Sequence, residues 1–274
     1  MFTLYQDLYP QPNEIRRKVF MLVGEGSVFL LILVLGIIFI RRAFRREMEL
    51  SAQQQNFILS ITHELKTPIT SIKLMLQTLQ GRTLEEDKRK DLLAQSIKEL
   101  DRLDSMVGNI LLTRSIEDRN YLMNRSEFAM DKLIHDVVDT MRSGILQNHE
   151  VKLQLEKITF NADSDAIRTI CTNLIENAAK YSRAGTSINI VLAKNSDTTF
   201  KFVVSDQGKG IVDKNKDQVF RKFFREGDEL TRKTKGTGLG LFIVKYLVEL
   251  HNGKIIIVDN IPCGTKVEII FKRG

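Results

Sequence analysis

Hydrophobic positions change their pattern twice along the chain, and these changes divide it into three main regions. Residues 19–40 form an almost uninterrupted apolar run, residues 51–118 repeat apolar side chains at helical spacing, and residues 119–274 mix strand-like and helix-like patterns. These patterns are typical of a membrane span, of packed helices and of an α/β domain. We therefore expect an α+β multidomain protein with a transmembrane helix, an α-helical hairpin and an α/β sandwich. A short N-terminal segment at 1–18 and a juxtamembrane linker at 41–50 complete the chain.

The apolar run has 22 residues, enough to cross a hydrocarbon layer about 30 Å thick. Glu25 interrupts it toward its N-terminal end, where a carboxylate is less unfavourable than at the membrane centre. A buried core helix is the alternative, but the arginines at 41–46 favour a span whose C-terminal side faces the cytoplasm. The basic cluster at 16–18 weakens this asymmetry, so charge alone leaves the orientation open.

The region from 51 to 118 predicts two antiparallel helices. A helical pattern runs from residue 41 to about residue 80 and is broken by Gly81. Thr83 and Glu86 then have the spacing of a capping box that starts the second helix. The second helix carries an apolar stripe made of Leu93, Ile97, Leu100, Val107 and Leu111. One hairpin cannot cover the stripes of both helices, so we expect two copies to pair into a four-helix bundle as a homodimer.

A polar stretch at 115–125 predicts a linker, and beyond it strands and helices mix. Helices are expected at 131–146, from Asp163 as N-cap through Ala178, and at 239–251. Short apolar or alternating runs predict strands at 151–155, 188–193, 200–204, 254–258 and 266–271. This order of elements favours helices on one face of a mixed sheet.

The formal net charge of +7 raises the question of nucleic-acid binding. Outside 41–46 the basic residues are scattered among acidic ones, and no basic stripe alternates with aromatic residues. The sequence therefore predicts no nucleic-acid partner. Cys171 and Cys263 lack metal-ligand spacing, and Cys171 falls on the apolar face of a predicted helix, which indicates a core position. We expect no disulfide between them in a cytoplasmic domain.

His63 stands beside Glu64 at the polar edge of the first hairpin helix, within the segment Phe57–Ile69. A single histidine on a helix is more often structural or solvated than chemical. The balance changes because a nucleotide-binding pattern follows more than a hundred residues later. An exposed histidine together with a nucleotide site indicates transfer of a phosphoryl group to nitrogen.

The first part of that pattern is a helix with Asn173, Asn177 and Lys180 along one face and Tyr181 at its end. A side-chain amide on this face can offer its oxygen to a hard cation such as Mg²⁺. The ammonium group of Lys180 is a suitable partner for a phosphate. We count all four residues as candidate ATP-binding positions, although a polar helix face alone would give the same pattern.

Two glycine loops form the second part of the pattern. Asp206 follows a predicted strand and can accept a hydrogen bond from the exocyclic amine of adenine, while Gly208 and Gly210 let the backbone approach a flat ring. The second loop precedes a helix, whose first N–H groups can meet phosphate oxygens. Its residues are Gly236, Thr237, Gly238, Leu239 and Gly240. Between the loops lies a basic segment with three phenylalanines at 220–224, either core contacts or the anchors of a lid over ATP.

In this order, the blocks resemble the sensor histidine kinases of two-component signalling over roughly residues 51–271. The resemblance implies that His63 is the phosphoacceptor, that Asn177 binds Mg²⁺, and that the C-terminal domain has the Bergerat fold of gyrase, Hsp90 and MutL. ATP and Mg²⁺ are the implied substrate and cofactor. Besides the second glycine loop, the implied nucleotide-binding blocks contain Asn173, Lys180, Asp206, Gly208 and Gly210, with Phe220, Phe223 and Arg225 in the lid.

The resemblance also implies a course of reaction. The Nε2 atom of His63 attacks the γ-phosphorus of ATP while Glu64 holds the other ring nitrogen. Arg225, Lys180 and Mg²⁺ neutralise the charge. The phosphoryl group then passes to an aspartate of a response regulator receiver domain, which acts in trans because this chain contains none. Glu64 and Thr67 match a Glu-x-x-Thr pattern that supports regulator dephosphorylation in similar kinases, although Thr67 could simply tolerate a bend at the following proline.

Two alternatives to a kinase stand beside this reading. A Bergerat-fold ATPase or ATP-gated clamp is disfavoured by the His63 block and the hairpin, and a non-catalytic ATP-binding scaffold is disfavoured by the intact nucleotide blocks. The chain departs from the family upstream, where no second span and no sensor domain are recognisable. We therefore expect either sensing through the membrane segment or a truncated sensor. The expected location is the bacterial inner membrane, with the kinase domains facing the cytoplasm.

Overall fold

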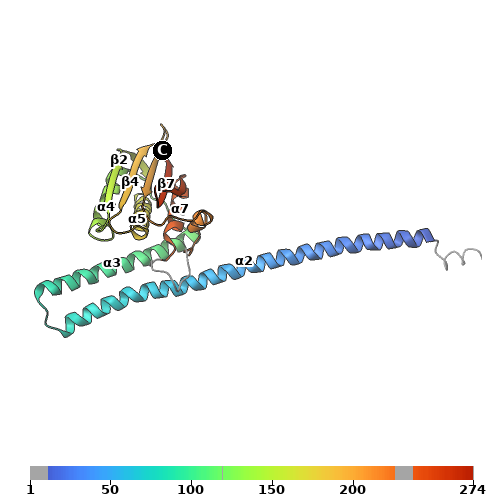
Figure 1. Cartoon of the computed structure of the whole chain (residues 1–274), viewed down its shortest axis with the longest axis horizontal. Helices are drawn as coiled ribbons and strands as arrows, with labels where there is room; N and C mark the ends of the chain where they lie inside the picture. The colour runs from blue at the N-terminus through green and yellow to red at the C-terminus, as the bar shows by residue number, and fades with distance from the viewer. Residues whose placement is uncertain (1–11, 119, 226–236, 274) are drawn as a thin grey trace, which may run out of the picture. The chain divides into compact units, whose positions relative to one another are not determined.

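The computed structural model describes residues 12–118, 120–225 and 237–273. The chain divides into two compact units, Met1–Asn56 and Phe57–Gly274. Helix α2, Pro12–Gly81, begins in the first unit and ends in the second (Figure 1). It contains the segment Arg16–Glu49, which is long and apolar enough to cross a bilayer. It is the one such helix in the described part of the chain.

The predicted hairpin is confirmed: α2 is followed by the antiparallel helix α3, Glu86–Glu117 (Figure 1). The capping box predicted at Thr83 is wrong, because the second helix begins only at Glu86. The preceding Glu85 has φ −58° and ψ 145°, and its side chain makes no capping hydrogen bond. Glu86 and Asp87 lie in the first turn, where their charges complement the positive end of the helix dipole.

Helix α3 also extends further than the sequence suggested. The linker predicted at 115–125 overlaps its last turn, because Ile116 has apolar partners and is buried in the core of the C-terminal domain. The rest of the linker is tied down as well. The hydroxyl of Tyr121 and the backbone N–H of Asn124 both donate to Oδ2 of Asp163, at 3.1 and 3.0 Å.

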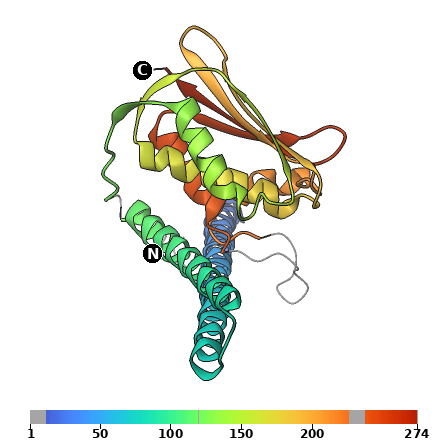
Figure 2. The same ribbon diagram turned by 90° about the vertical axis from the view of Figure 1, so that its left-hand side faces the viewer.

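The C-terminal domain is built on a five-stranded sheet in the order β2-β4-β5-β7-β6. The β2 and β4 strands are parallel, and the other neighbours are antiparallel. Helices α4, α5 and α7 cover one face of the sheet (Figure 2), which confirms the predicted two-layer arrangement. The helices are Met130–Arg142, Ser164–Tyr181 and Gly240–Leu250, and the strands β2 and β4–β7 are Glu150–Leu155, Ser187–Lys194, Thr199–Ser205, Lys254–Asp259 and Thr265–Lys272.

A small second sheet was not predicted. Strand β1, Ser126–Ala129, pairs antiparallel with β3, Thr159–Ala162. Each strand has four residues, too few for an alternating pattern to stand out. After β5 follow a short helix α6, Asp213–Lys216, and a 3₁₀ turn η1, Gln218–Phe220. Helix α4 ends at Arg142, earlier than the predicted residue 146, and hydrogen-bonded turns replace its last turn.

The core of the domain lies between the sheet and the helices. Phe160, Phe200 and Phe271 form an aromatic cluster with ring centroids 4.9 to 5.6 Å apart. Cys171 on α5 is fully buried, which confirms its predicted core position. Burial raises the pKa of the Cys171 thiol to about 12, so this cysteine is unreactive at neutral pH.

Candidate functional site

His63 is exposed on α2, and the next residue, Glu64, is buried with 8% of its surface accessible. The neighbours on one helix therefore face different surroundings, one open to a reaction partner and one held by the protein. Thr67 lies one turn beyond His63 and is half-buried. Its hydroxyl donates to the backbone carbonyl of His63 at 3.1 Å, which fixes the side chain against the turn that carries the histidine.

Arg102 on α3 joins this site, and the sequence analysis missed it. Its Nη2 atom lies 3.7 Å from Oε2 of Glu64. The two residues belong to different helices of the hairpin, and their contact depends on the helix register. A charge pattern along one helix cannot show such a pair. Glu64 and Arg102 therefore become neighbours only through the tertiary structure.

Helix α5 carries the predicted asparagine face and begins where the sequence placed it. Asp163 is its N-cap and accepts hydrogen bonds from the N–H groups of Asp165 and Ala166 at 3.0 and 3.1 Å. Asn173 is buried, and a Cβ atom placed on Gly240 would lie 2.6 Å from its Oδ1 atom. Gly240 is therefore needed where the asparagine helix meets the start of α7. Two predicted nucleotide-binding blocks come together at this point.

The end of α5 is positively charged. Lys180 is half-buried, and its Nζ atom lies 5.2 Å from the ring centroid of Tyr181, which is 38% exposed. Burial lowers the pKa of Lys180 to about 8; the charge of Arg225 acts in the same direction, and Glu64 opposes it. Asn177, one turn before Tyr181, is also half-buried. Lys180 thus interacts with two arginines, Arg225 and Arg102, and with two carboxylates, Glu64 and Glu176. An ammonium group in a partly dry site can bind an anion.

The first glycine loop is held by its own aspartate. Oδ1 of Asp206 accepts hydrogen bonds from the N–H groups of Gly208 and Thr265, at 2.8 and 3.1 Å. Asn260 donates to the Asp206 carbonyl at 2.8 Å. Asp206 is 7% exposed, and burial raises the pKa of its carboxyl group against the effect of these donors. These three hydrogen bonds fix the Asp206 side chain and backbone within the loop.

Glycines are required around this loop. A Cβ atom on Gly208 would lie 2.5 Å from the carbonyl oxygen of Tyr181. Gly264, in the turn between β6 and β7, has φ +113°, and a Cβ atom there would lie 2.0 Å from the carbonyl oxygen of Asp206. The sequence placed Gly264 in a turn but gave no sign of this contact. Gly210 has φ +73°, a conformation that favours glycine.

The second glycine loop is described from Thr237 onward, so the predicted Gly236 lies outside the described residues. Gly238 has φ +73°, and its carbonyl accepts a hydrogen bond from the N–H of Phe223 at 3.1 Å. Leu239 is fully buried, and its N–H donates to Oγ1 of Thr237 at 3.4 Å. Phe223, which the sequence predicts either as a core contact or as a lid anchor, is thus hydrogen-bonded directly to this loop.

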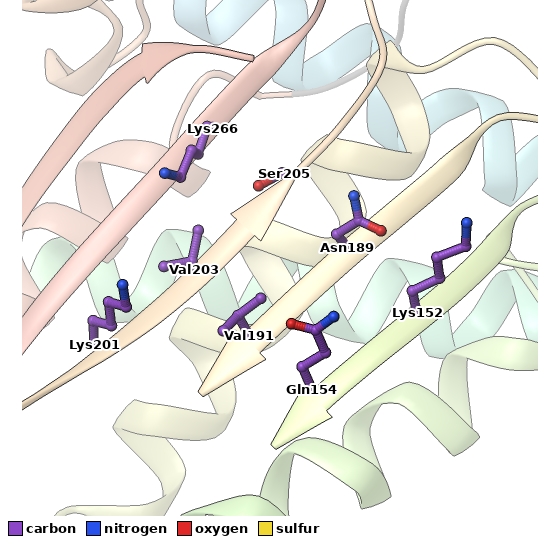
Figure 3. A pocket seen from close by; sticks show the side chains of 8 residues that line it. All are labelled: Lys152, Gln154, Asn189, Val191, Lys201, Val203, Ser205 and Lys266. Carbon is purple, nitrogen blue, oxygen red and sulfur yellow. The ribbon is translucent and has the colours of Figure 1, made fainter. Parts of the chain in front are cut away.

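A shallow depression of about 420 Å³ lies elsewhere, on the sheet face opposite the helices (Figure 3). Its lining comes from four strands and includes none of the predicted nucleotide-binding residues. Two of its lysines have acidic neighbours, since Lys152 pairs with Glu150 and Lys266 with Glu268. The depression is lined by Lys152, Gln154, Asn189, Val191, Lys201, Val203, Ser205 and Lys266.

The donor set fits Mg²⁺ held together with a nucleotide. In the part of the chain that the structure describes, no three His, Cys, Asp or Glu side chains converge as a metal cluster. Mg²⁺ on a nucleotide needs few protein ligands, because phosphate oxygens and waters complete its shell. A half-buried Asn177 near Lys180 is consistent with that chemistry.

Comparison with known families supports this assignment of parts. Residues 53–119 match the His Kinase A (phospho-acceptor) domain, and residues 162–274 match the histidine kinase-, DNA gyrase B- and HSP90-like ATPase family. The two matches contain the His63 block and the nucleotide-binding blocks, respectively.

Individual relatives cover most of this chain. Sensor protein KdpD of Clostridium acetobutylicum is 28% identical over 78% of the chain, and sensor protein SrrB of Staphylococcus aureus is 28% identical over 84%. The chain spans only 24% and 40% of the lengths of these relatives. A mycobacterial sensor histidine kinase structure, MprB, is 27% identical with a TM-score of 0.50, covering 55% of this chain and 98% of its own.

Proposed function

This chain belongs to the sensor histidine kinases, with a HisKA and an ATP-binding HATPase domain, and we propose that it phosphorylates its own His63 from ATP. The observation that carries the proposal is the presence, in one chain, of an exposed histidine within the phospho-acceptor domain and of a separate domain of the ATPase family. The chain thus contains both a phosphoryl acceptor and an ATP-binding domain that could supply the phosphoryl group.

The proposed transfer forms a bond between Nε2 of His63 and the γ-phosphorus and breaks the bond from that phosphorus to the β,γ-bridging oxygen, with ADP leaving. The proton on the other ring nitrogen is shared with Glu64, which fixes the tautomer. Lys180 and Arg225 neutralise charge on the phosphates, and positioning contributes more than covalent help in such reactions. The exposure of His63 supports its access to a phosphate.

The nucleotide would lie between α5 and the two glycine loops. The carboxylate of Asp206 would accept from the adenine amine beside Gly208 and Gly210. The loop from Gly236 to Gly240 would meet the phosphates, as would Asn173 and Lys180. Asn177 would hold Mg²⁺, which supplies charge neutralisation on the phosphate oxygens when bound. The tight packing of Asp206, Gly208 and Gly264 supports a site of fixed shape.

The partners follow from the family and the exposed hairpin. We propose a homodimer through α2 and α3, and a response regulator whose aspartate receives the phosphoryl group in trans. We also propose that the segment Arg16–Glu49 anchors the chain in the bacterial inner membrane, with both domains in the cytoplasm. Glu64 and Thr67 would support dephosphorylation of the regulator. In that case Thr67→Ala should slow regulator dephosphorylation and leave labelling of His63 near normal, and equal dephosphorylation rates would refute this part.

The central test is incubation of the full chain in detergent with γ-labelled ATP. Phosphohistidine is labile to acid and stable to alkali, and we expect a label with this behaviour on the wild-type chain. The variant His63→Gln should carry no label and should bind ATP with unchanged affinity, because His63 is not part of the nucleotide site. Labelling of His63→Gln at the wild-type rate would refute the assignment. Release of free phosphate without any protein label would identify an ATPase.

A further inference from the structure

Arg102 of α3 lies next to Glu64, one of the residues in the proposed phosphoryl transfer. Its guanidinium group approaches two carboxylates, that of Glu64 at 3.7 Å and that of Glu99 at 3.9 Å. The side chain of Glu64 is 9% exposed and that of Arg102 is 40% exposed. A carboxylate as buried as this one is stable only with a fixed partner. Arg102 provides such a partner from the neighbouring helix of the same hairpin.

Glu64 is shared between cations of two elements. Besides Arg102, its charge acts on Lys180 of α5, the ammonium group that we propose for phosphate binding. A phosphate competes with Glu64 for this ammonium group, because it carries more negative charge and more acceptor oxygens. When Lys180 turns to a phosphate, Arg102 stays with Glu64 on the hairpin.

We propose that Arg102 is a positioning residue that holds the Glu64 carboxylate on the hairpin, next to His63, while Lys180 binds the phosphates of ATP. The inference rests on the proposed function, since it assigns Glu64 to the ring nitrogen of His63 that is not under attack. Without Arg102, the carboxylate is drawn toward the cations of the nucleotide site, and the imidazole loses its orienting acceptor. Glu99, three residues before Arg102, steadies the guanidinium group from its other side.

The test compares Arg102→Gln with Arg102→Lys in the full chain, by autophosphorylation rate at saturating ATP. The Gln variant should be slower by about tenfold, as expected when a reacting group loses its orientation. Its KM for ATP should stay within about twofold, because Arg102 is not proposed to bind the nucleotide. The Lys variant keeps the charge and should recover most of the rate. Arg89→Gln is the matched control on the same helix, since Arg89 pairs with Glu86 at 3.9 Å and is 61% exposed.

A double-mutant cycle separates positioning from a structural role. If Arg102 acts through Glu64, then Glu64→Gln with Arg102→Gln should be no slower than Glu64→Gln alone. Equal slowing by Arg102→Gln in the wild-type and Glu64→Gln backgrounds would overturn the proposal. A wild-type rate of Arg102→Gln, or an Arg102→Lys variant no faster than Arg102→Gln, would overturn it as well. A loss of ATP affinity or of dimer in Arg102→Gln would also overturn it. Failure of this proposal can be told apart from failure of the proposed function. The proposed kinase function fails only if His63→Gln is labelled or the wild type is not.

Discussion

The hairpin and the ATP-binding domain differ in how much of their apolar surface one chain can bury. Within the domain, Ile170, Phe202 and Val244 are fully buried. On the hairpin, Ile97 and Leu111 are 59% and 64% exposed. Among the described residues, the buried hydrophobic side chains all lie at Ile116 or later. The ATP-binding domain therefore has its own core, and the hairpin has an apolar stripe without one.

The difference indicates which part of the protein needs a second copy. Covering one exposed Leu or Ile side chain contributes roughly 1.5–3 kcal/mol, so a stripe of five can drive association of two hairpins. The stability of the hairpin then depends on protein concentration, whereas that of the ATP-binding domain does not. Autophosphorylation should therefore depend on protein concentration, and nucleotide binding should not.

The largest effect is expected from charges placed on the stripe. Ile97→Asp together with Leu111→Asp should abolish the dimer, because both side chains would be buried as unpaired carboxylates in a four-helix bundle. The affinity for ATP should remain unchanged, since the ATP-binding domain has its own core. Light scattering in detergent measures the molar mass, and calorimetry measures the affinity. The control is Lys98→Asp, an exposed polar position on the same helix, which should stay dimeric. A dimeric double variant would remove the contrast between the two parts.

A local change should damage the ATP-binding domain without touching the hairpin. Gly264→Ala introduces a Cβ atom 2.0 Å from the Asp206 carbonyl oxygen at φ +113°, so the loop must move. We expect a loss of about 3 kcal/mol in unfolding free energy and a strong loss of ATP affinity. Gly185→Ala is the matched control: it also has positive φ, +83°, but no atom within 4 Å. It should cost about 1 kcal/mol from backbone strain alone. Equal effects at both glycines, measured by denaturant unfolding, would contradict the proposed contact.

This pair of glycines also shows where sequence reasoning reaches its limit. The elements themselves were accessible: Asp163 was correctly predicted as the cap of α5, and short apolar or alternating runs located all five strands of the main sheet. Gly264 was recognised as a turn residue, but its contact with Asp206 depends on the sheet order, which places the β6–β7 turn beside the end of β5. No local pattern contains that order.

The same limit applies to charge. Glu64 and Lys180 were both singled out from their own helices, yet neither helix indicated that their charges interact. Arg102 was missed because its partner lies on another helix. Capping at Thr83 was predicted wrongly from the three-residue spacing of Thr83 and Glu86, which also occurs by chance. Local preferences thus predict elements and residue types, whereas partners across elements require the register of the packed structure.

An intermediate effect is expected from pH. Lys180 has a pKa lowered to about 8 from 10.5, so between these values the unfolded chain holds more protons than the folded one. The unfolding free energy should therefore increase as pH rises through that window, because the folded chain has already lost the Lys180 proton. The affinity for ATP should fall over the same window, by at most about tenfold per pH unit, since one proton is involved. Calorimetry from pH 7 to 9.5 measures the affinity. Lys180→Arg keeps its charge throughout and should remove this dependence. An equally pH-dependent Arg variant would assign it to another group.

The smallest effect tests how firmly the linker belongs to the ATP-binding domain. Tyr121→Phe removes one hydrogen bond to Asp163 and keeps the ring, so unfolding free energy of the domain should fall by about 1 kcal/mol. Burial opposes ionisation of Asp163, but the N–H donors of Asn124 and Ala166 and the Tyr121 hydroxyl hold its pKa below the usual value. Ionised Asp163 therefore stabilises the fold at neutral pH, and this contribution is lost as pH falls through its folded pKa. Because the tyrosine bond favours the ionised form, the difference between wild type and Tyr121→Phe should shrink in the same acidic range. Chemical unfolding at pH 7 and below pH 4 measures the difference in unfolding free energy between wild type and Tyr121→Phe at each pH. An equal difference at both pH values would show that the stabilisation by the Tyr121 hydroxyl does not depend on the charge of Asp163.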